Sequence, residues 1–210
     1  MKPLDGSREL NQALRIIRNG GHRGSRATLK LLRTAAGLGH PTAKYALATW
    51  YLHGAGVRVN FRKAVELLLA AAQKNVAPAH FDLAICYELG KGVRRSSQQA
   101  FLHYFEAAQL GDRGAQTDVG RCLYYEIGTT RDYCAAAKWY LRAAKRGDRD
   151  AQYAIGHSYE FGTGVRRNVA RARFWYARAA EQGYGGAKRA LKELDRELSQ
   201  EKSRGKEGRR

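Results

Sequence analysis

The sequence lacks the features that place a protein in a membrane or in the secretory route. Its 210 residues contain no run of about 18 consecutive apolar residues, so no segment is predicted to span a bilayer. The first ten residues, MKPLDGSREL, contain no apolar run of the kind found in a secretory signal. These absences predict a cytoplasmic protein without a membrane span.

Cysteine is scarce, with three residues in the chain: Cys86, Cys122 and Cys134. Three cysteines cannot all pair with one another, and they lack the closely spaced pairs of a zinc site. Because a free cysteine behaves as a small hydrophobe, we expect buried or half-buried thiols. The sequence therefore predicts neither a metal site nor a disulfide framework.

Motifs of known catalytic chemistry are also absent. The six histidines do not form HExxH, no serine lies in GxSxG, and there is no phosphate-binding GxxxxGK[ST]. Short GxG elements occur, but they end predicted helices instead of following strands, and they recur along the chain. We interpret them as structural turns and predict no enzyme activity and no cofactor.

Acidic residues are few relative to basic ones. The chain has 19 Asp and Glu against 38 Lys and Arg, which gives a net charge of +19 and a pI near 10.2. The excess is spread along the whole chain. A field of one sign favours acidic partners and speeds encounter with them, although it does not name them.

The chain does have an internal repeat of 36 residues. The segment 151–183 recurs without insertions at 115–147, 79–111 and 43–75. An exact period of this length is typical of stacked-repeat proteins, in which each unit buries its apolar face against its neighbours.

Each copy predicts two short helices joined by a glycine turn. In the last copy, Ala151, Ile155 and Tyr159 fall on one face of a helix. Two glycines then predict a tight loop, a polar residue caps the second helix, and paired alanines allow close helix packing. A glycine or asparagine at the left-handed C′ position ends the unit. The predicted N-caps are Asn60, Ser96, Asp132 and Asn168, and the predicted C′ residues are Asn75, Gly111, Gly147 and Gly183.

These positions follow the pattern A-x-x-x-[LIV]-[AG]-x-x-Y, G-x-G-V, A-x-x-x-[YL]-x-x-A-A-x-x-G, which resembles the Sel-one-like repeat (SLR) from Ala43 to Gly183. The resemblance implies a tetratricopeptide-like α/α superhelix. The third copy departs from the pattern at Leu123, Glu126 and Thr129, which puts its turn geometry in question. A branch of the family with one disulfide per repeat is not matched.

We therefore predict an all-α fold, a right-handed α/α solenoid of about five helix-turn-helix repeats and a C-terminal capping helix. A degenerate first repeat with alanines at 35 and 36 serves as the N-terminal cap, polar on its outer side. The expected parts are an N-terminal cap at 1–39, with a glycine-rich turn at 19–25, repeats at 40–75, 76–111, 112–147 and 148–183, a capping helix at 184–200, and a basic disordered tail at 201–210.

Two sets of side chains are candidates for binding. A second stripe on the first helices, about 200° from the inward one, carries aromatic and charged residues. The resemblance implies that this stripe lines a concave groove suited to an extended peptide or a partner's helix, and the alternative is packing between adjacent first helices. Its members are Tyr45, His53, Phe81, Ile85, Glu88, Arg121, Tyr124, Tyr125, Tyr153, His157, Glu160 and Phe161.

The second set consists of arginines beside the glycine turns. Stacked repeats would align them about 10 Å apart, as a comb for phosphates of nucleic acid or of a membrane surface. The alternative is a solvated edge that keeps the protein soluble. The arginines are Arg58, Arg94, Arg95, Arg166 and Arg167.

The predicted function is a non-catalytic scaffold or adaptor that binds a partner protein or peptide, of acidic character, in the groove. SLR proteins serve as adaptors in bacterial signalling and secretion and in eukaryotic protein quality control, so the resemblance implies this role. Two other hypotheses remain open. One is a binder of nucleic acid or anionic surfaces, weak and blind to sequence, through the arginines. The other is an immunity-type neutraliser of a secreted toxin.

Overall fold

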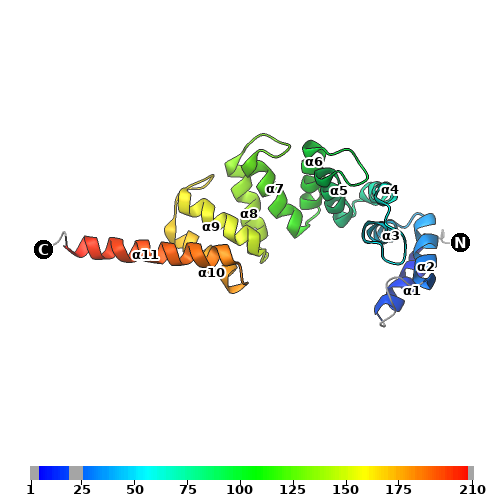
Figure 1. Ribbon diagram of the computed structural model, residues 1–210, viewed down its shortest axis with the longest axis horizontal. Coiled ribbons are helices and arrows are strands. Elements are labelled where there is room, and N and C mark those ends of the chain that lie inside the picture. Colours follow the sequence, from blue (N-terminus) through cyan, green and yellow to red (C-terminus); the bar gives the residue numbers. More distant parts are fainter. Residues whose placement is uncertain (1–4, 19–25, 208–210) are drawn as a thin grey trace. The chain divides into compact units, whose positions relative to one another are not determined.

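The computed structural model of this chain describes residues 5–18 and 26–207. These residues form eleven α-helices and no strand, which confirms the all-α prediction (Figure 1). The glycine-rich turn predicted at 19–25 lies outside the described residues. The helices are α1 (Ser7–Arg18), α2 (Arg26–Gly37), α3 (Pro41–His53), α4 (Phe61–Ala72), α5 (Ala77–Leu89), α6 (Ser97–Gln109), α7 (Arg113–Tyr125), α8 (Tyr133–Lys145), α9 (Arg149–Phe161), α10 (Val169–Glu181) and α11 (Gly185–Glu207).

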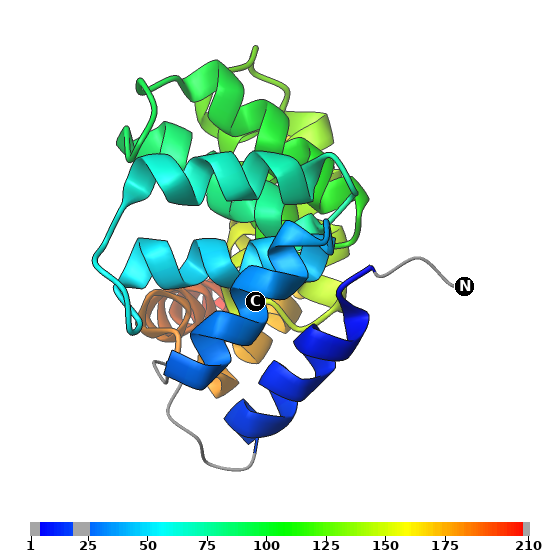
Figure 2. The same cartoon turned by 90° about the vertical axis from the view of Figure 1, so that its right-hand side faces the viewer.

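The chain divides into two compact units. Unit 1, Met1–Asp112, holds α1 to α6, and unit 2, Arg113–Arg210, holds α7 to α11. Within each unit, the two helices of every pair pack against each other, and most pairs pack on the next helix in the chain. Figures 1 and 2 both show α1 beside α2 and α3 beside α4. This sequential packing is the arrangement that a helix-turn-helix repeat requires.

The capping residues have the roles that the sequence predicts. The side chains of Asn60, Ser96, Asp132 and Asn168 each accept a hydrogen bond from the backbone N–H three residues further on, at the start of α4, α6, α8 and α10. Each cap satisfies one of the N–H groups that a helix leaves without a partner. The residues that close the second helices have positive φ, from 56° at Asn75 to 93° at Gly111.

The irregular turn after α7 keeps the conformation of the others. Glu126 has φ of 60°, close to the 72°, 69° and 70° of Gly54, Gly90 and Gly162. A residue with a Cβ is strained in this left-handed region. Its carboxylate lies 3.3 Å from the Arg131 guanidinium on the other side of the turn. The substitution thus stores strain in the turn without changing its path.

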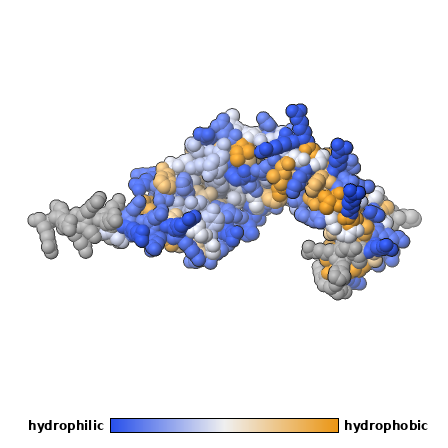
Figure 3. Space-filling model, in the orientation of Figure 1, coloured by the Kyte–Doolittle hydropathy of each residue, from blue (hydrophilic) through white to orange (hydrophobic). Residues whose placement is uncertain are grey.

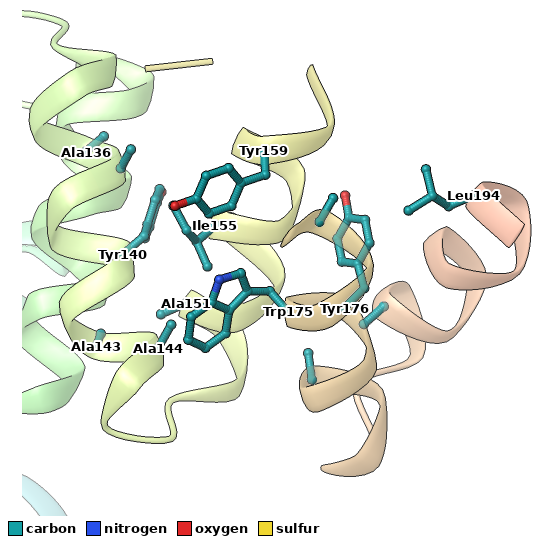
Figure 4. Packing of buried hydrophobic residues seen from close by; sticks show 14 residues of the cluster. Ala136, Tyr140, Ala143, Ala144, Ala151, Ile155, Tyr159, Trp175, Tyr176 and Leu194 are labelled. Carbon is teal, nitrogen blue, oxygen red and sulfur yellow. The ribbon is translucent and has the colours of Figure 1, made fainter. Parts of the chain in front are cut away.

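Alanine pairs bring the helices close together. Ala143 and Ala144 of α8 are fully buried, and in unit 2 they belong to one core cluster with Ala151, Ile155 and Trp175 (Figure 4). In unit 1 the corresponding pairs of α4 and α6 are buried in the same way. The first-helix residues predicted to point inward are buried as well, and Ile155 is fully inaccessible.

A tyrosine near the middle of the second helix packs against a small residue of the first helix. A Cβ placed on Gly120 of α7 would lie 2.7 Å from the Tyr140 ring of α8, and one placed on Gly156 of α9 would lie 2.7 Å from the Tyr176 ring of α10. Only glycine permits ring contacts this close at these two positions.

The last helix is longer than predicted. α11 runs from Gly185 to Glu207, through residues that the sequence predicts to be a disordered tail from 201 onward. Leu194 of this helix is 2% exposed within the unit 2 core. Figure 3 shows separate hydrophobic areas among hydrophilic ones on the face of Figure 1. In the described part of the chain, no helix is long and apolar enough to cross a membrane.

Candidate functional site

In unit 1, several predicted groove residues are engaged by their own fold. Burial, together with the negative charge of the nearby Asp82, raises the pKa of Tyr45 to about 12. Burial also raises the pKa of Asp82, while the nearby His53 opposes this shift. The ring of Phe81 packs edge-on against Tyr104, with centroids 5.7 Å apart. Ile85, on the same helix, is half-buried.

Two glutamates of the predicted groove hold a structural hydrogen bond. Glu88 accepts from the hydroxyl of Tyr104 at 2.6 Å, and Glu160 accepts from the hydroxyl of Tyr176 at 2.5 Å. In both cases the tyrosine follows its glutamate by 16 residues, from the first helix to the second helix of one pair. Each carboxylate therefore satisfies a hydroxyl that folding would otherwise bury unpaired.

In unit 2, the predicted residues of α7 and α9 form an aromatic cluster. We define it as Tyr124, Tyr125, His157 and Phe161. The ring centroids of Tyr124 lie 4.8 Å from Tyr125 and 6.5 Å from His157, and His157 lies 4.5 Å from Phe161. Tyr125 is 63% exposed and Phe161 is 62% exposed. The outer rings of the cluster are therefore surface groups, whereas Tyr124 and His157 are half-buried beneath them.

A pocket lies beside this cluster, between α7, α8 and α9. Its volume is about 300 Å³. Most of its lining is aromatic, with one arginine and one exposed aspartate. The lining residues are Thr117, Arg121, Tyr124, Tyr125, Tyr140, Asp150, Tyr153, Ala154, His157 and Tyr184.

Charges at the pocket are partly paired within the protein. Arg121, one of the predicted groove residues, donates from Nε to Asp118 Oδ1 at 3.0 Å. Its positive charge still acts on Tyr140, where it opposes the rise in pKa that burial causes. Asp150 lies 3.9 Å from Arg149, and its charge contributes to the raised pKa of Tyr184, of which burial is the main cause.

Several hydroxyls at the pocket have no hydrogen-bond partner among the described residues, and two of them either belong to a buried side chain or are themselves buried. One is Tyr140, whose side chain points from α8 toward α9 (Figure 4). The position 16 residues before it holds Tyr124, not the glutamate of the other two pairs. The other is Thr117, whose Oγ1 is buried. Both hydroxyls therefore remain available for groups from outside the chain.

Sequence reasoning did not include Tyr140 or Tyr184, and it placed Thr117 on the second stripe without making it a candidate for binding. A signal for Thr117 and Tyr140 is present in the alignment of the copies. Thr117 stands where the other copies carry Tyr45, Phe81 or Tyr153, and the spacing of 16 from glutamate to tyrosine fails at one copy. Tyr184 follows the last C′ glycine and reaches Tyr153 with a centroid distance of 4.8 Å. No repeat pattern marks that contact.

The candidate arginines are all exposed, and Arg58 of unit 1 lies among other basic side chains. It lines a surface hollow with Arg33, Arg62 and Lys63, and no acidic side chain is among the lining residues. Arg94 and Arg95 line a second hollow at the start of α6. In unit 2, Arg167 donates to the backbone oxygen of Glu160 at 2.9 Å, and Arg166 lies beside it in the same turn.

All three cysteines are free; Cys86 and Cys122 are buried, whereas Cys134 is exposed. Burial raises the pKa of the Cys86 thiol to about 11, so this thiol stays protonated and unreactive. Within residues 5–18 and 26–207, no group of three or more histidine, cysteine or acidic residues is placed to hold a metal ion.

Comparison with solved structures finds the same fold in other repeat proteins. A protective antigen of uropathogenic Escherichia coli with an SLR fold superposes with a TM-score of 0.83 and 27% identity, over 89% of this chain and 40% of that one. The present chain thus spans well under two thirds of that antigen. A Sel1 repeat protein from Oxalobacter formigenes gives a TM-score of 0.77 and 25% identity, over 84% of this chain and 73% of that one.

An immunity protein from Pseudomonas aeruginosa shares the fold at lower similarity, with a TM-score of 0.54 and 24% identity over 88% of this chain and 67% of that one. A search of curated protein sequences gives no match. A model of the Sel1 repeat matches residues 41–76, 77–112, 114–148 and 149–184, which together cover more than half of the chain. The four matches coincide with the helix pairs α3/α4, α5/α6, α7/α8 and α9/α10, and the chain therefore belongs to the Sel1 repeat family.

Proposed function

We propose that this protein is a non-catalytic interaction module that binds an acidic partner protein or peptide through the aromatic cluster of unit 2. The observation that carries the proposal is the exposure of Tyr125 and Phe161, 63% and 62%, on rings held in place by half-buried neighbours. Aromatic side chains that are exposed in the free protein and preorganised supply much of the binding energy at interfaces.

The charge of the chain supports a partner of acidic character. A net charge of +19 accelerates encounter with an acidic surface. Sel1 repeats fit this role because stacked helix pairs create extended surfaces on which a partner can bind. Fold likeness alone transfers no function, so the immunity protein of P. aeruginosa names no partner for this chain.

The test is an affinity capture from the native cell with three forms of the protein as bait. The double variant Tyr125→Ala, Phe161→Ala removes both exposed rings. The control variant Phe174→Ala removes a ring of similar exposure, 51%, on α10 outside the cluster. We expect partners that the wild type and the control retain to be lost with the double variant, and titration of a recovered partner to give a loss of about 2 kcal/mol or more.

Equal recovery with all three baits would reject the aromatic cluster as the binding surface. Thermal melts of each variant distinguish lost binding from lost folding. Because both rings are mostly in solvent, we expect the melting temperature of the double variant to stay close to that of the wild type.

A second candidate function rests on the basic hollow of unit 1. Arg33, Arg58, Arg62 and Lys63 face it with no acidic residue in the lining, which favours an anion such as a phosphate group. We expect weak binding to a mixed-sequence RNA that falls steeply with added salt and is lost when Arg58 and Arg62 are changed to glutamate. Tight binding to one sequence at physiological salt would contradict this weak, sequence-independent mode.

A further inference from the structure

Two helix pairs of this chain show which side chains surround the tyrosine of the second helix when both of its partners are present. In α5/α6 and in α9/α10, an aromatic ring, Phe81 or Tyr153, packs on the tyrosine, with centroids 5.7 and 5.5 Å apart. In the same pairs a glutamate accepts the hydroxyl hydrogen bond. The tyrosine is thereby covered on its ring and paired at its oxygen.

The pair α7/α8 has the tyrosine but neither partner. Thr117 replaces the aromatic ring, and because threonine is smaller, the side chain leaves space beside Tyr140. Tyr124 replaces the glutamate, so the Tyr140 hydroxyl has no acceptor among the described residues. The pocket of about 300 Å³ lies where these two substitutions meet. The other two pairs therefore identify the missing acceptor of the Tyr140 hydroxyl as a carboxylate.

We propose that this pocket receives the side-chain carboxylate of a glutamate or aspartate from the partner, which accepts a hydrogen bond from the Tyr140 hydroxyl as Glu88 and Glu160 do from Tyr104 and Tyr176. The inference deepens the proposed function, on which it rests, by naming the group that the partner inserts beside the aromatic cluster. Hydrogen bonds to an ionised acceptor are roughly twice as strong as neutral ones.

The other polar groups of the pocket agree with an anionic occupant. Thr117 offers a buried hydroxyl without a partner. Arg121 contributes positive charge even while it is paired with Asp118, since that charge acts on Tyr140. Asp150 opposes an anion, but it is exposed and lies near Arg149. Rings alone would also attract a cation, and the guanidinium of Arg121 disfavours that occupant.

The test uses blocked single amino acids as probes and the full chain, observed by NMR with labelled tyrosine rings. N-acetylglutamate N-methylamide presents the side-chain carboxylate, and the glutamine analogue has the same shape without the charge. We expect saturable shifts at Tyr140 with the glutamate probe and at least about tenfold weaker binding of the glutamine probe. Equal binding of the two probes would overturn the proposal.

Two further probes separate the competing occupants. N-acetylglycine presents a terminal carboxylate, and lysine acetylated at Nα, as its N-methylamide, presents the side-chain cation. Stronger binding of N-acetylglycine than of the glutamate probe would overturn the assignment to a side chain, and preferential binding of the lysine probe would overturn the assignment to an anion.

Two variants test whether the glutamate probe binds at the Tyr140 hydroxyl. Tyr140→Phe keeps the ring, and we expect it to weaken binding of the glutamate probe about tenfold. The matched variant Tyr176→Phe removes a hydroxyl that is already paired with Glu160, so we expect it to leave the affinity for the probe unchanged. Tyr124→Glu supplies the acceptor from within, so we expect it to abolish probe binding and raise the melting temperature. Unchanged affinity in both Tyr140→Phe and Tyr124→Glu would overturn the proposal.

The same variants distinguish this inference from the proposed function. A recovered partner that binds Tyr140→Phe as well as the wild type, but not the double variant of Tyr125 and Phe161, would refute the carboxylate pocket and leave the aromatic surface standing. A partner unaffected by the double variant would refute the proposed function, while the glutamate probe still reports on the pocket.

Discussion

The helix pairs α5/α6 and α7/α8 are built on one plan and differ at the point where function is proposed. Both carry a tyrosine on the second helix and a small residue at the matching position of the first, Tyr104 with Ala84 in one pair and Tyr140 with Gly120 in the other. Gly120 lies so close to the Tyr140 ring that a Cβ there would be 2.7 Å from it. In α5/α6 the tyrosine hydroxyl is satisfied by Glu88. In α7/α8 the Tyr140 hydroxyl has no such acceptor among the described residues, and Tyr140 lines a pocket. A repeat protein can thus close a site in one unit and open the equivalent site in the next by changing two side chains.

The largest expected effect tests the packing that the two pairs share. Gly120→Ala places a Cβ 2.7 Å from the Tyr140 ring, so the ring or the helix has to move. We expect a loss of about 2–3 kcal/mol in the free energy of unfolding, measured by urea denaturation. The matched change Ala84→Gly in α5 relieves no clash and should cost only about 1 kcal/mol, through helix propensity. Equal costs at both positions would show that the glycine does not set the helix distance.

The next effect concerns the hydroxyl pairing that separates the two pairs. Glu88→Ala removes the acceptor of the Tyr104 hydroxyl, which should cost about 2 kcal/mol because the oxygen stays buried. A double-mutant cycle with Tyr104→Phe should give a coupling energy of about 1–2 kcal/mol. The corresponding cycle of Tyr124→Ala with Tyr140→Phe should give a coupling near zero. Similar couplings in the two cycles would erase the distinction between the pairs.

A pH dependence should arise from His103 of α5/α6, and the equivalent position of α7/α8 cannot contribute one. His103 of α6 lies with Nδ1 3.2 Å from His80 Nδ1, and burial, with a smaller contribution from His80, lowers its pKa from 6.5 to about 4. Between those pH values the unfolded chain binds a proton at His103 that the folded protein does not bind. The free energy of unfolding therefore falls as the pH drops through 6.5 toward 4. The equivalent residue of α8 is Trp139, which does not titrate.

We expect His103 to account for a loss of about 1–2 kcal/mol between pH 7 and pH 5, after allowance for partial solvent screening. The variant His103→Phe keeps a ring against Tyr87 and should flatten the stability profile in that range. The measurement is urea denaturation of both proteins at a series of pH values. An unchanged slope in the variant would assign the pH dependence to other groups.

The smallest effect tests the turns. Glu126→Gly releases a left-handed residue from strain and should stabilise the protein by about 0.5–1 kcal/mol, since the exposed pair with Arg131 contributes little. The reverse change in the equivalent turn, Gly90→Glu, should destabilise by about 1 kcal/mol. Thermal melts of the two variants check the opposite signs. A loss of stability in Glu126→Gly would mean that its ion pair outweighs the strain.

Much of the local structure follows from short-range sequence. The period of 36 residues, the N-caps such as Asn168 and the C′ residues such as Gly183 predict the helices and their ends, because each depends on backbone geometry within a few residues. The end of α11 was missed, since a charged segment such as 201–207 carries no apolar face that would mark it as helix.

The sequence by itself determined the family, the helix pairs and which stripe of each first helix is buried, because periodicity and capping are local properties. Only the tertiary structure decided that Glu88 and Glu160 pair with tyrosines of the next helix, that Tyr125 and Phe161 stand in solvent, and that Tyr140 faces a pocket. Those outcomes depend on how closely two helices approach and on which side chains then compete for the same space, and neither is contained in the spacing of residues along one chain.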